Sequence, residues 1–269
     1  MAETGGNFER LIVRSLDLVR LAQFKSRFIP RDLILTYHSV ESAPSGYKFA
    51  VQRDRFEKQI NYLQSQVDIV PLAELHRPRT NRRPRIAITF DDAYADFYEN
   101  VYPLFRQHGI PAVVFVPTLF IGAEQGLLER DEGIAKPHLT WEQMDEIQAT
   151  SAIEFGSHTH SHWGAVDQID RLAADVEISV ELLETHLGKR PRYFAYPYGQ
   201  YNEKTHQIVM HCEFDSILTM DDVPLAAGSI QGRLDIYERN QTLPYFKLTT
   251  AGLLGPGTRA RIRQAFYGR

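Results

Sequence analysis

The chain of 269 residues has one cysteine, Cys212, and no apolar run long enough to cross a bilayer as a helix. A single cysteine excludes an internal disulfide framework and a cysteine-rich zinc site, and a membrane-spanning helix needs about 20 predominantly apolar residues. The N-terminus also lacks the uninterrupted apolar stretch and small-residue cleavage site of a signal peptide. The sequence therefore predicts a soluble, cytoplasmic protein.

An excess of one charge sign is also lacking, because 30 Lys and Arg residues face 34 Asp and Glu residues, for a net charge of −4. Nucleic-acid binders usually carry a basic face, so we expect no nucleic-acid partner. Positive charge gathers near the two ends, where residues 8–28 mix basic with apolar side chains and residues 250–269 carry arginines but no acid. Such a stretch either docks on the domain as a helix or lies on an anionic membrane surface, which would place the protein on the inner membrane face.

The composition, with 43% hydrophobic and 24% charged residues, is that of an ordinary globular protein with a sizeable core. No repeat, low-complexity tract or Gly/Ser linker divides the chain. The sequence predicts an amphipathic helical extension over residues 1–32, one α/β domain over residues 33–249 and a basic tail over residues 250–269.

Short apolar, β-branched runs alternate with longer amphipathic segments within this domain, a pattern typical of a parallel sheet covered by helices. Helices are predicted over residues 53–66 and 168–187, and over residues 94–108 with a kink at Pro103. The side chains that follow the carboxyl ends of parallel strands meet at one edge, where chemistry gathers. Strands are predicted over residues 33–37, 86–90, 112–116, 153–156, 193–196 and 214–219, with a seventh that starts near Leu234.

Two adjacent carboxylates, Asp91 and Asp92, directly follow the strand predicted over residues 86–90. Neighbouring side chains at a strand end diverge, so that one carboxylate can hold a metal while the other handles a proton. Aspartate is also a favoured helix cap, and taken alone the pair is better explained as the cap of the helix that starts near Tyr94.

Three histidines, at positions 158, 160 and 162, follow the strand predicted over residues 153–156. His158 and His162 face the same side if this segment turns helically, whereas His160 points away. Two neutral imidazoles with a carboxylate form a common catalytic zinc set that leaves a position open for water. A metal lowers the pKa of bound water from 15.7 to about 7, so the combination of histidines and aspartates predicts a hydrolase.

A third segment, residues 194–199, is an aromatic strand that breaks into a turn at Pro197, Tyr198 and Gly199. By itself it is a plain turn. The three segments in this order, however, resemble the motifs of the polysaccharide deacetylases, which share the NodB homology domain and are also called carbohydrate esterase family 4. Residues 89–92 look like the first motif, residues 157–162 like the second and residues 196–199 like the third. The resemblance covers about residues 33–235 and implies that the domain is a deformed (β/α) barrel of about seven strands.

The resemblance also implies a divalent metal held by Asp92, His158 and His162. Zinc is the common metal of the family, and Ni²⁺, Co²⁺ and Fe²⁺ suit the same ligands. Asp91 would be the general base that prepares water for attack on an N-acetyl carbonyl. Thr159 and Ser161 would orient the loop that carries the histidines.

Pro197 and Tyr198 of the third segment would lie against the substrate, with the backbone N–H of Tyr198 near the developing oxyanion. The family usually places there an arginine that pairs with the base, and Ala195 stands in its position. Arg233, within residues 232–236, resembles an arginine found late in one branch of the family and is the expected replacement. Arg192 is nearer in sequence, although a surface role is as good an explanation for it.

The general acid departs from the common pattern too, because many members supply it from a late Leu-x-His motif and no histidine follows His211 here. The branch that includes the deacetylases of poly-β-1,6-N-acetylglucosamine looks circularly permuted and takes its acid from an early strand. Residues 35–40 resemble the opening of that branch, so His38 is the expected general acid, with a buried structural histidine as the alternative.

The function implied is that of a metal-dependent hydrolase which removes N-acetyl groups from amino sugars in a polysaccharide or glycan precursor. An N-acetylated glycan is then the expected partner. Two alternatives stay open, an O-acetyl esterase on the same fold and a carbohydrate-binding protein without activity. The intact set of aspartates and histidines disfavours the second.

Overall fold

The computed structural model describes residues 32–81, 83–220, 230–237 and 242–250. Apart from Asp32 and Thr250, the extension expected over residues 1–32 and the basic tail expected over residues 250–269 lie outside these ranges. Within the described residues, no helix has the length and apolarity needed to cross a bilayer.

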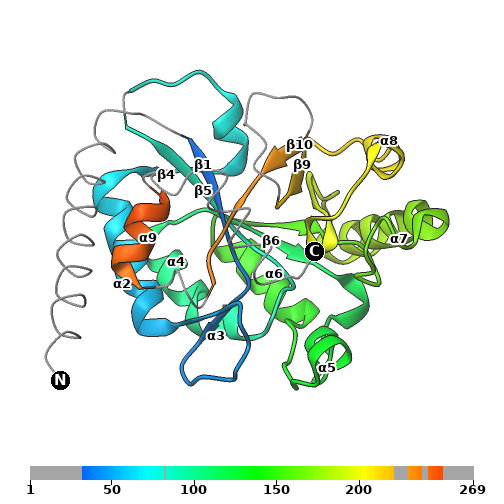
Figure 1. The fold of residues 1–269 in the computed structure, drawn as a ribbon, viewed down its shortest axis with the longest axis horizontal. Coiled ribbons are helices and arrows are strands. Elements are labelled where there is room, and N and C mark those ends of the chain that lie inside the picture. Colours follow the sequence, from blue (N-terminus) through cyan, green and yellow to red (C-terminus); the bar gives the residue numbers. More distant parts are fainter. Residues whose placement is uncertain (1–31, 82, 221–229, 238–241, 251–269) are drawn as a thin grey trace, which may run out of the picture.

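Parallel strands form one curved sheet with helices packed outside it (Figure 1). The strand order is β10-β9-β8-β7-β6-β5-β1-β11, and the short β4 (Asp68–Ile69) also pairs with the start of β5. The strands of this order are β1 (Leu33–Tyr37), β5 (Arg85–Phe90), β6 (Ala112–Val116), β7 (Ile153–Ser157), β8 (Tyr193–Ala195), β9 (Ser216–Thr219), β10 (Ile230–Gly232) and β11 (Leu234–Asp235).

The two edges of this sheet are joined by a single residue, Arg233, which separates β10 from β11. β10 pairs with β9 at one edge, whereas β11 pairs with β1 at the other. The Arg233 N–H donates to the Thr219 carbonyl, and three residues later the Ile236 N–H donates to the Thr36 carbonyl. This continuous stretch therefore changes partners and curls the sheet into a nearly closed barrel. Counted as one strand, it gives the seven strands of the predicted deformed barrel.

Most predicted elements are present in the structure. The helix over residues 53–66 is α2 (Arg53–Gln66), the helix over residues 168–187 is α7 (Ile169–Leu187), and every predicted strand is found within a few residues. The helix predicted over residues 94–108 is broken into α3 (Asp96–Asn100) and α4 (Tyr102–His108), because Pro103 has no N–H to donate and its ring disfavours a continuous helix.

Several short elements were not predicted, since each lacks a long periodic pattern. β2 (Ser39–Glu41) and β3 (Ala50–Gln52) form a separate two-stranded sheet. The remaining unpredicted helices are α5 (Leu127–Glu132), α6 (Trp141–Thr150), α8 (Glu203–Met210) and α9 (Leu243–Thr250), with 3-10 turns η1 (Leu72–His76), η2 (Thr118–Phe120) and η3 (Pro197–Gly199).

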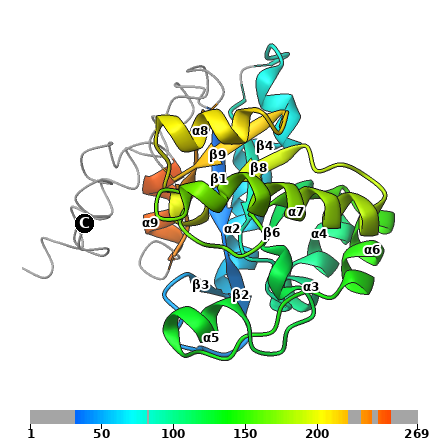
Figure 2. The ribbon, with the colours of Figure 1, turned by 90° about the vertical axis from the view of Figure 1, so that its right-hand side faces the viewer.

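Successive side chains along each strand point to opposite faces of the sheet, so the apolar side chains fall into two clusters, one outside and one inside the barrel. Leu35 and Phe90 face outward and pack against Phe56 of α2, in the larger cluster, and α7 and α8 lie side by side on another outer face of the barrel (Figure 2). The apolar cluster within the barrel is smaller, and includes Phe115 of β6. Polar side chains replace it toward the carboxyl ends, where Thr36 and Thr89 are hydrogen-bonded to each other. The barrel thus has an apolar base and a polar end that bears the candidate site.

Candidate active site

The carboxyl ends of the parallel strands bring the predicted site residues to one end of the barrel. His38 follows β1, Asp91 and Asp92 follow β5, His158 follows β7, and Arg233 follows β10. Because all the strands are parallel, residues nearly 200 positions apart in the sequence meet there.

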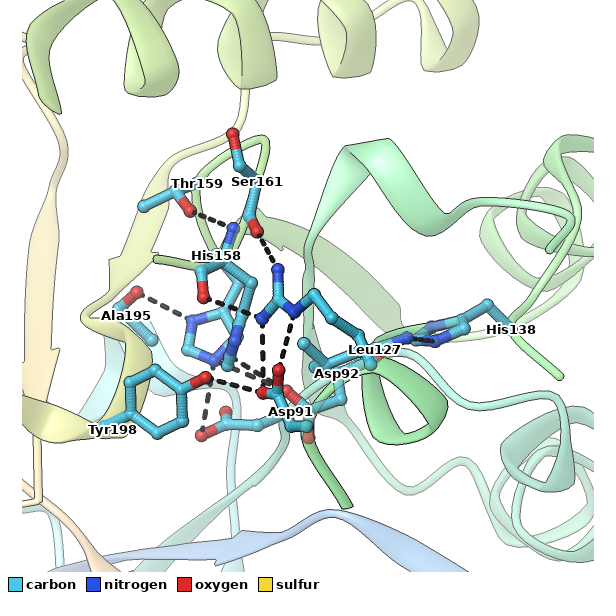
Figure 3. Close-up of polar contacts among 12 residues, drawn as sticks. Asp91, Asp92, Leu127, His138, His158, Thr159, Ser161, Ala195 and Tyr198 are labelled. Carbon is cyan, nitrogen blue, oxygen red and sulfur yellow. Dashed lines mark hydrogen bonds and ion pairs between the residues drawn. The ribbon is translucent and has the colours of Figure 1, made fainter. Parts of the chain in front are cut away.

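Asp92, His158 and His162 form one compact, buried group, of which Asp92 and His158 are labelled in Figure 3. The Nε2 atoms of His162 and His158 lie 3.3 Å and 3.7 Å from Asp92 Oδ1. One ligand atom from each residue can be chosen so that all three atoms lie within 4.8 Å of one another, and no other such group of three is found among the described residues.

The protonation of His158 and Asp92 suits a divalent metal. His158 Nδ1 lies 2.7 Å from the Ala195 carbonyl, which can only accept, so Nδ1 carries the proton and the Nε2 lone pair faces Asp92. Burial lowers the pKa of His158 to about 4, which keeps the ring neutral. Burial acts to raise the pKa of Asp92, but the hydrogen bond from His162 and the neighbouring histidines hold it well below its usual range. Neutral imidazole and ionised carboxylate are the forms in which these groups bind metal.

The segment that carries the histidines is a loop, so the predicted helical turn is wrong. Thr159 and His162 have φ values of 64° and 56°, in the left-handed region. Asp175 of α7 accepts hydrogen bonds from the backbone N–H groups of residues 160 and 161 and from the Ser161 hydroxyl, and Thr159 Oγ1 accepts from the His162 N–H at 3.0 Å. These bonds fix the loop. His160 lies outside the group, as expected, with Nδ1 2.9 Å from Thr118 Oγ1.

The turn that carries the two aspartates is also irregular. Asp92 and Ala93 have φ values of 70° and 52°. The interpretation of the pair as a helix cap is wrong, because α3 begins only at Asp96, is preceded by Ala95 and has no side-chain cap. The left-handed backbone turns the chain abruptly at the end of β5, and the two carboxylates then face different partners.

Asp91 pairs with Arg233 through both of its carboxylate oxygens. Nη1 and Nη2 of Arg233 lie 2.6 Å and 2.8 Å from the two carboxylate oxygens of Asp91, and both side chains are buried. Burial acts to raise the pKa of Asp91, but the Arg233 guanidinium together with His158 and His38 lowers the pKa below its usual value. Asp91 Oδ2 is 4.0 Å from His158 Nε2, so an ionised carboxylate stands directly beside the candidate metal ligands. Arg192, in contrast, pairs with Asp215 on the surface.

His38 and Tyr198 of the third segment each stack on or lie against another ring near this group. The His38 ring is half-buried and stacks on Phe49, with 4.6 Å between ring centroids. The Tyr198 ring lies 4.9 Å from that of His162, and Tyr198 is 49% exposed, whereas Pro197 is buried. Of the two predicted substrate contacts, only the Tyr198 side chain is open to solvent.

Comparisons with known proteins agree with this geometry. A family model described as polysaccharide deacetylase matches residues 78–217, just over half of the chain. The chain belongs to the polysaccharide deacetylase family.

Relatives of this deacetylase include the poly-beta-1,6-N-acetyl-D-glucosamine N-deacetylase of Staphylococcus aureus, 28% identical over 198 residues, or 69% of this chain and 63% of that protein. The Escherichia coli protein of the same name is 23% identical over 224 residues, or 70% of this chain and 33% of that protein. The chain therefore spans less than two thirds of either relative. The structure of IcaB from Ammonifex degensii has a TM-score of 0.69 at 26% identity, and covers 83% of this chain and 98% of that one.

Several residues around the deacetylase site were not predicted from the sequence. Arg130 of α5 donates to the carbonyls of Ser161 and His162 at 2.8 Å and 3.3 Å. Its guanidinium lies 4.4 Å from the ring centroid of Trp163, which is 51% exposed. The next residue, Asp131, accepts a hydrogen bond from the Tyr198 hydroxyl at 2.7 Å. No sequence signal identifies these contacts, because α5 has no motif and reaches the histidine loop only in the folded chain.

Proposed function

We propose that this polysaccharide deacetylase is a metal-dependent N-deacetylase of N-acetylglucosamine polymers, with the β-1,6-linked polymer as the first candidate. The observation that supports it most strongly is the pairing of two units. One is the buried group of Asp92, His158 and His162, and the other is the ionised Asp91 beside it. The names of the Staphylococcus aureus and Escherichia coli relatives suggest the linkage.

Asp92, His158 and His162 would hold the cation, with zinc as the first candidate and Co²⁺, Ni²⁺ and Fe²⁺ compatible with the same donors. When bound, such an ion polarises a carbonyl oxygen and favours the ionisation of water. Asp91 would accept the proton of the attacking water. Its two hydrogen bonds to Arg233 fix the plane of the carboxylate and keep it ionised, while each oxygen retains a lone pair for the incoming proton.

The leaving nitrogen needs a proton of its own, since an amide does not leave as a free amine anion. We assign this step to His38, which stands at the end of β1, next to β5 in the sheet. An ester releases an alcohol, which depends less on an acid. The two substrate classes therefore report on the role of His38.

Replacing His38 with alanine is expected to lower kcat for N-acetyl substrates by about 10²–10⁴-fold, while activated acetyl esters lose less than about tenfold. Acetate release from an N-acetylglucosamine oligomer and from an aryl acetate measures both. His76→Ala is the matched control, because His76 is exposed and hydrogen-bonded to Ser216, at the opposite end of the barrel. An equal loss on the two substrates would remove the acid role.

We assign substrate contact on the rim to Trp163. It directly follows His162, and Arg130 covers one face of its ring. A half-exposed aromatic ring that is already held by a neighbour offers a flat apolar surface to a sugar ring.

Trp163→Ala is expected to raise KM for oligomers about tenfold with kcat nearly unchanged, which corresponds to a loss of about 1.4 kcal/mol in binding. Steady-state kinetics on a pentamer measures the change, and Ile178→Ala, on an exposed part of α7, serves as the control. A fall in kcat at constant KM would contradict a contact made equally in ground and transition states.

The proposal as a whole is tested by acetate release from β-1,6-linked and β-1,4-linked N-acetylglucosamine oligomers by the metal-loaded protein. Faster release from the β-1,6 oligomer supports the proposed substrate. Release only from the β-1,4 oligomer would keep the chemistry and replace the linkage, and release from neither would contradict the proposal.

A further inference from the structure

The proposed chemistry does not use His138, a buried histidine that contacts the backbone of Asp92 in the metal group. It is 3% exposed and its backbone forms an isolated antiparallel bridge with Tyr94. Nδ1 lies 2.9 Å from the backbone carbonyl of Asp92, and Nε2 lies 3.1 Å from the backbone N of Leu127 (Figure 3). The ring also stacks on Phe120, with 5.5 Å between centroids.

These two partners determine which nitrogen of the ring carries the proton. The Asp92 carbonyl can only accept a hydrogen bond, so Nδ1 must carry the hydrogen. The Leu127 N–H can only donate, so Nε2 must be unprotonated to accept from it. His138 is therefore a neutral imidazole in the Nδ1–H form, which makes both bonds at once.

Each bond meets a local need of the chain. Asp92 is a non-glycine residue at φ 70°, a conformation that persists only where the surroundings hold it. Leu127 is the first residue of α5, so its N–H has no acceptor within the helix, and the preceding Gly126 has no side chain to cap it. A Cβ on Gly126 would lie 2.4 Å from two atoms of the His138 ring, which shows how closely the ring fits there.

Helix α5 also contacts two other segments of the same site. Its Arg130 donates to the carbonyls of Ser161 and His162, and its Asp131 accepts from Tyr198. One imidazole thus lies between the turn that carries Asp92 and the helix that holds the loop of His162.

We propose that His138 is a positioning residue with two separable roles. Its Nδ1–H bonds the backbone carbonyl of Asp92 and so holds the carboxylate of that residue in place for metal binding. Its Nε2 anchors the start of α5 and, through α5, the rim of the site. This inference rests on the proposed metal group.

Two substitutions separate the roles, because the amide of asparagine reaches about as far as Nδ1 and that of glutamine about as far as Nε2. His138→Asn keeps a donor for the Asp92 carbonyl and loses the acceptor for Leu127. His138→Gln keeps the acceptor and loses the donor. Titration of Co²⁺ into metal-free protein, followed by calorimetry and by visible absorption, is compared with steady-state kinetics on an oligomer.

We expect His138→Gln to bind Co²⁺ about 10–100-fold more weakly with an altered absorption spectrum, as for other residues that orient metal ligands. His138→Asn is expected to bind Co²⁺ within about threefold of the wild type and to show its main change in KM. His186→Asn, on the outer helix α7 where the ring stacks on Trp141, is the control. Equal Co²⁺ affinity in all the folded variants, or a larger loss for asparagine than for glutamine, would overturn the assignment. A wild type that binds no Co²⁺ would instead overturn the metal group itself and this inference with it.

A second measurement reports on the hydrogen bonds of the ring in the wild-type protein, with variants used only to assign the signals. Two-dimensional ¹⁵N NMR of the histidine rings should show a neutral Nδ1–H ring in addition to that of His158, and its signals should disappear in His138→Phe and persist in His186→Asn. Assignment of His138 as an Nε2–H or doubly protonated ring would contradict the proposed hydrogen bonds.

Discussion

Asp91→Asn is expected to lower kcat for acetate release by about 10²–10⁴-fold, because the amide matches the shape of the carboxylate but cannot accept the proton of the attacking water. The metal content of the folded protein should be unchanged, since Asp92, His158 and His162 supply the ligand atoms. Initial rates on an N-acetylglucosamine oligomer and elemental analysis of the same preparation measure the two quantities together.

The matched control for this substitution is Asp215→Asn. Asp215 also pairs with an arginine, Arg192, at 2.6 Å, but both side chains are about half exposed at the surface. It should retain full activity. Rates for Asp91→Asn within tenfold of the wild type, with the protein folded and metal-loaded, would show that another group takes the proton.

Arg233→Met is expected to cost about 3–5 kcal/mol in the free energy of unfolding near neutral pH, because it leaves the buried Asp91 carboxylate without its partner. Arg192→Met, which breaks the exposed pair with Asp215, should cost only about 0–1 kcal/mol. Urea denaturation of the two variants gives the comparison. Equal costs would indicate that water or another cation compensates Asp91.

The same variant changes the pH dependence in a defined direction. In the wild type the pKa of Asp91 is lowered, because Arg233, His158 and His38 together outweigh the effect of burial, and Arg233 contributes most. Asp91 therefore stabilises the fold above its ordinary pKa, and that contribution is lost as the pH falls through the lowered value. Without Arg233 the pKa of Asp91 rises, so the acid limb of the rate profile should move to higher pH and the stability deficit should shrink in acid. If the acid limb of the rate profile does not move, the ionisation that causes it does not belong to Asp91.

The strands and the main site residues were predictable because their signals are local or follow chain order. Apolar runs mark β1, β5, β6 and β7, and the residues that directly follow the strands meet at the carboxyl end of a parallel sheet. Arg233 required the resemblance, since Ala195 occupies the usual position of the arginine. Its contact with Asp91 follows from the closure of the barrel at the residue between β10 and β11.

The remaining features depend on contacts between distant segments. The left-handed φ of Thr159 and His162 is stabilised by Asp175, which belongs to α7, so no pattern within residues 158–162 reveals that the loop is not helical. His138 illustrates the same limit. Its role depends on two backbone groups, of Asp92 and Leu127, that the fold brings to the two sides of one ring.

Metal dependence of acetate release is the most direct test of the proposed function. Protein stripped with a chelator and dialysed is assayed on β-1,6-linked N-acetylglucosamine oligomers, then assayed again after one equivalent of Zn²⁺ or Co²⁺ is added. The proposed group of Asp92, His158 and His162 requires activity to disappear with the metal and to return at about one ion per chain. His162→Ala should not regain activity under the same conditions. Full acetate release by protein shown to be free of metal would contradict the central claim.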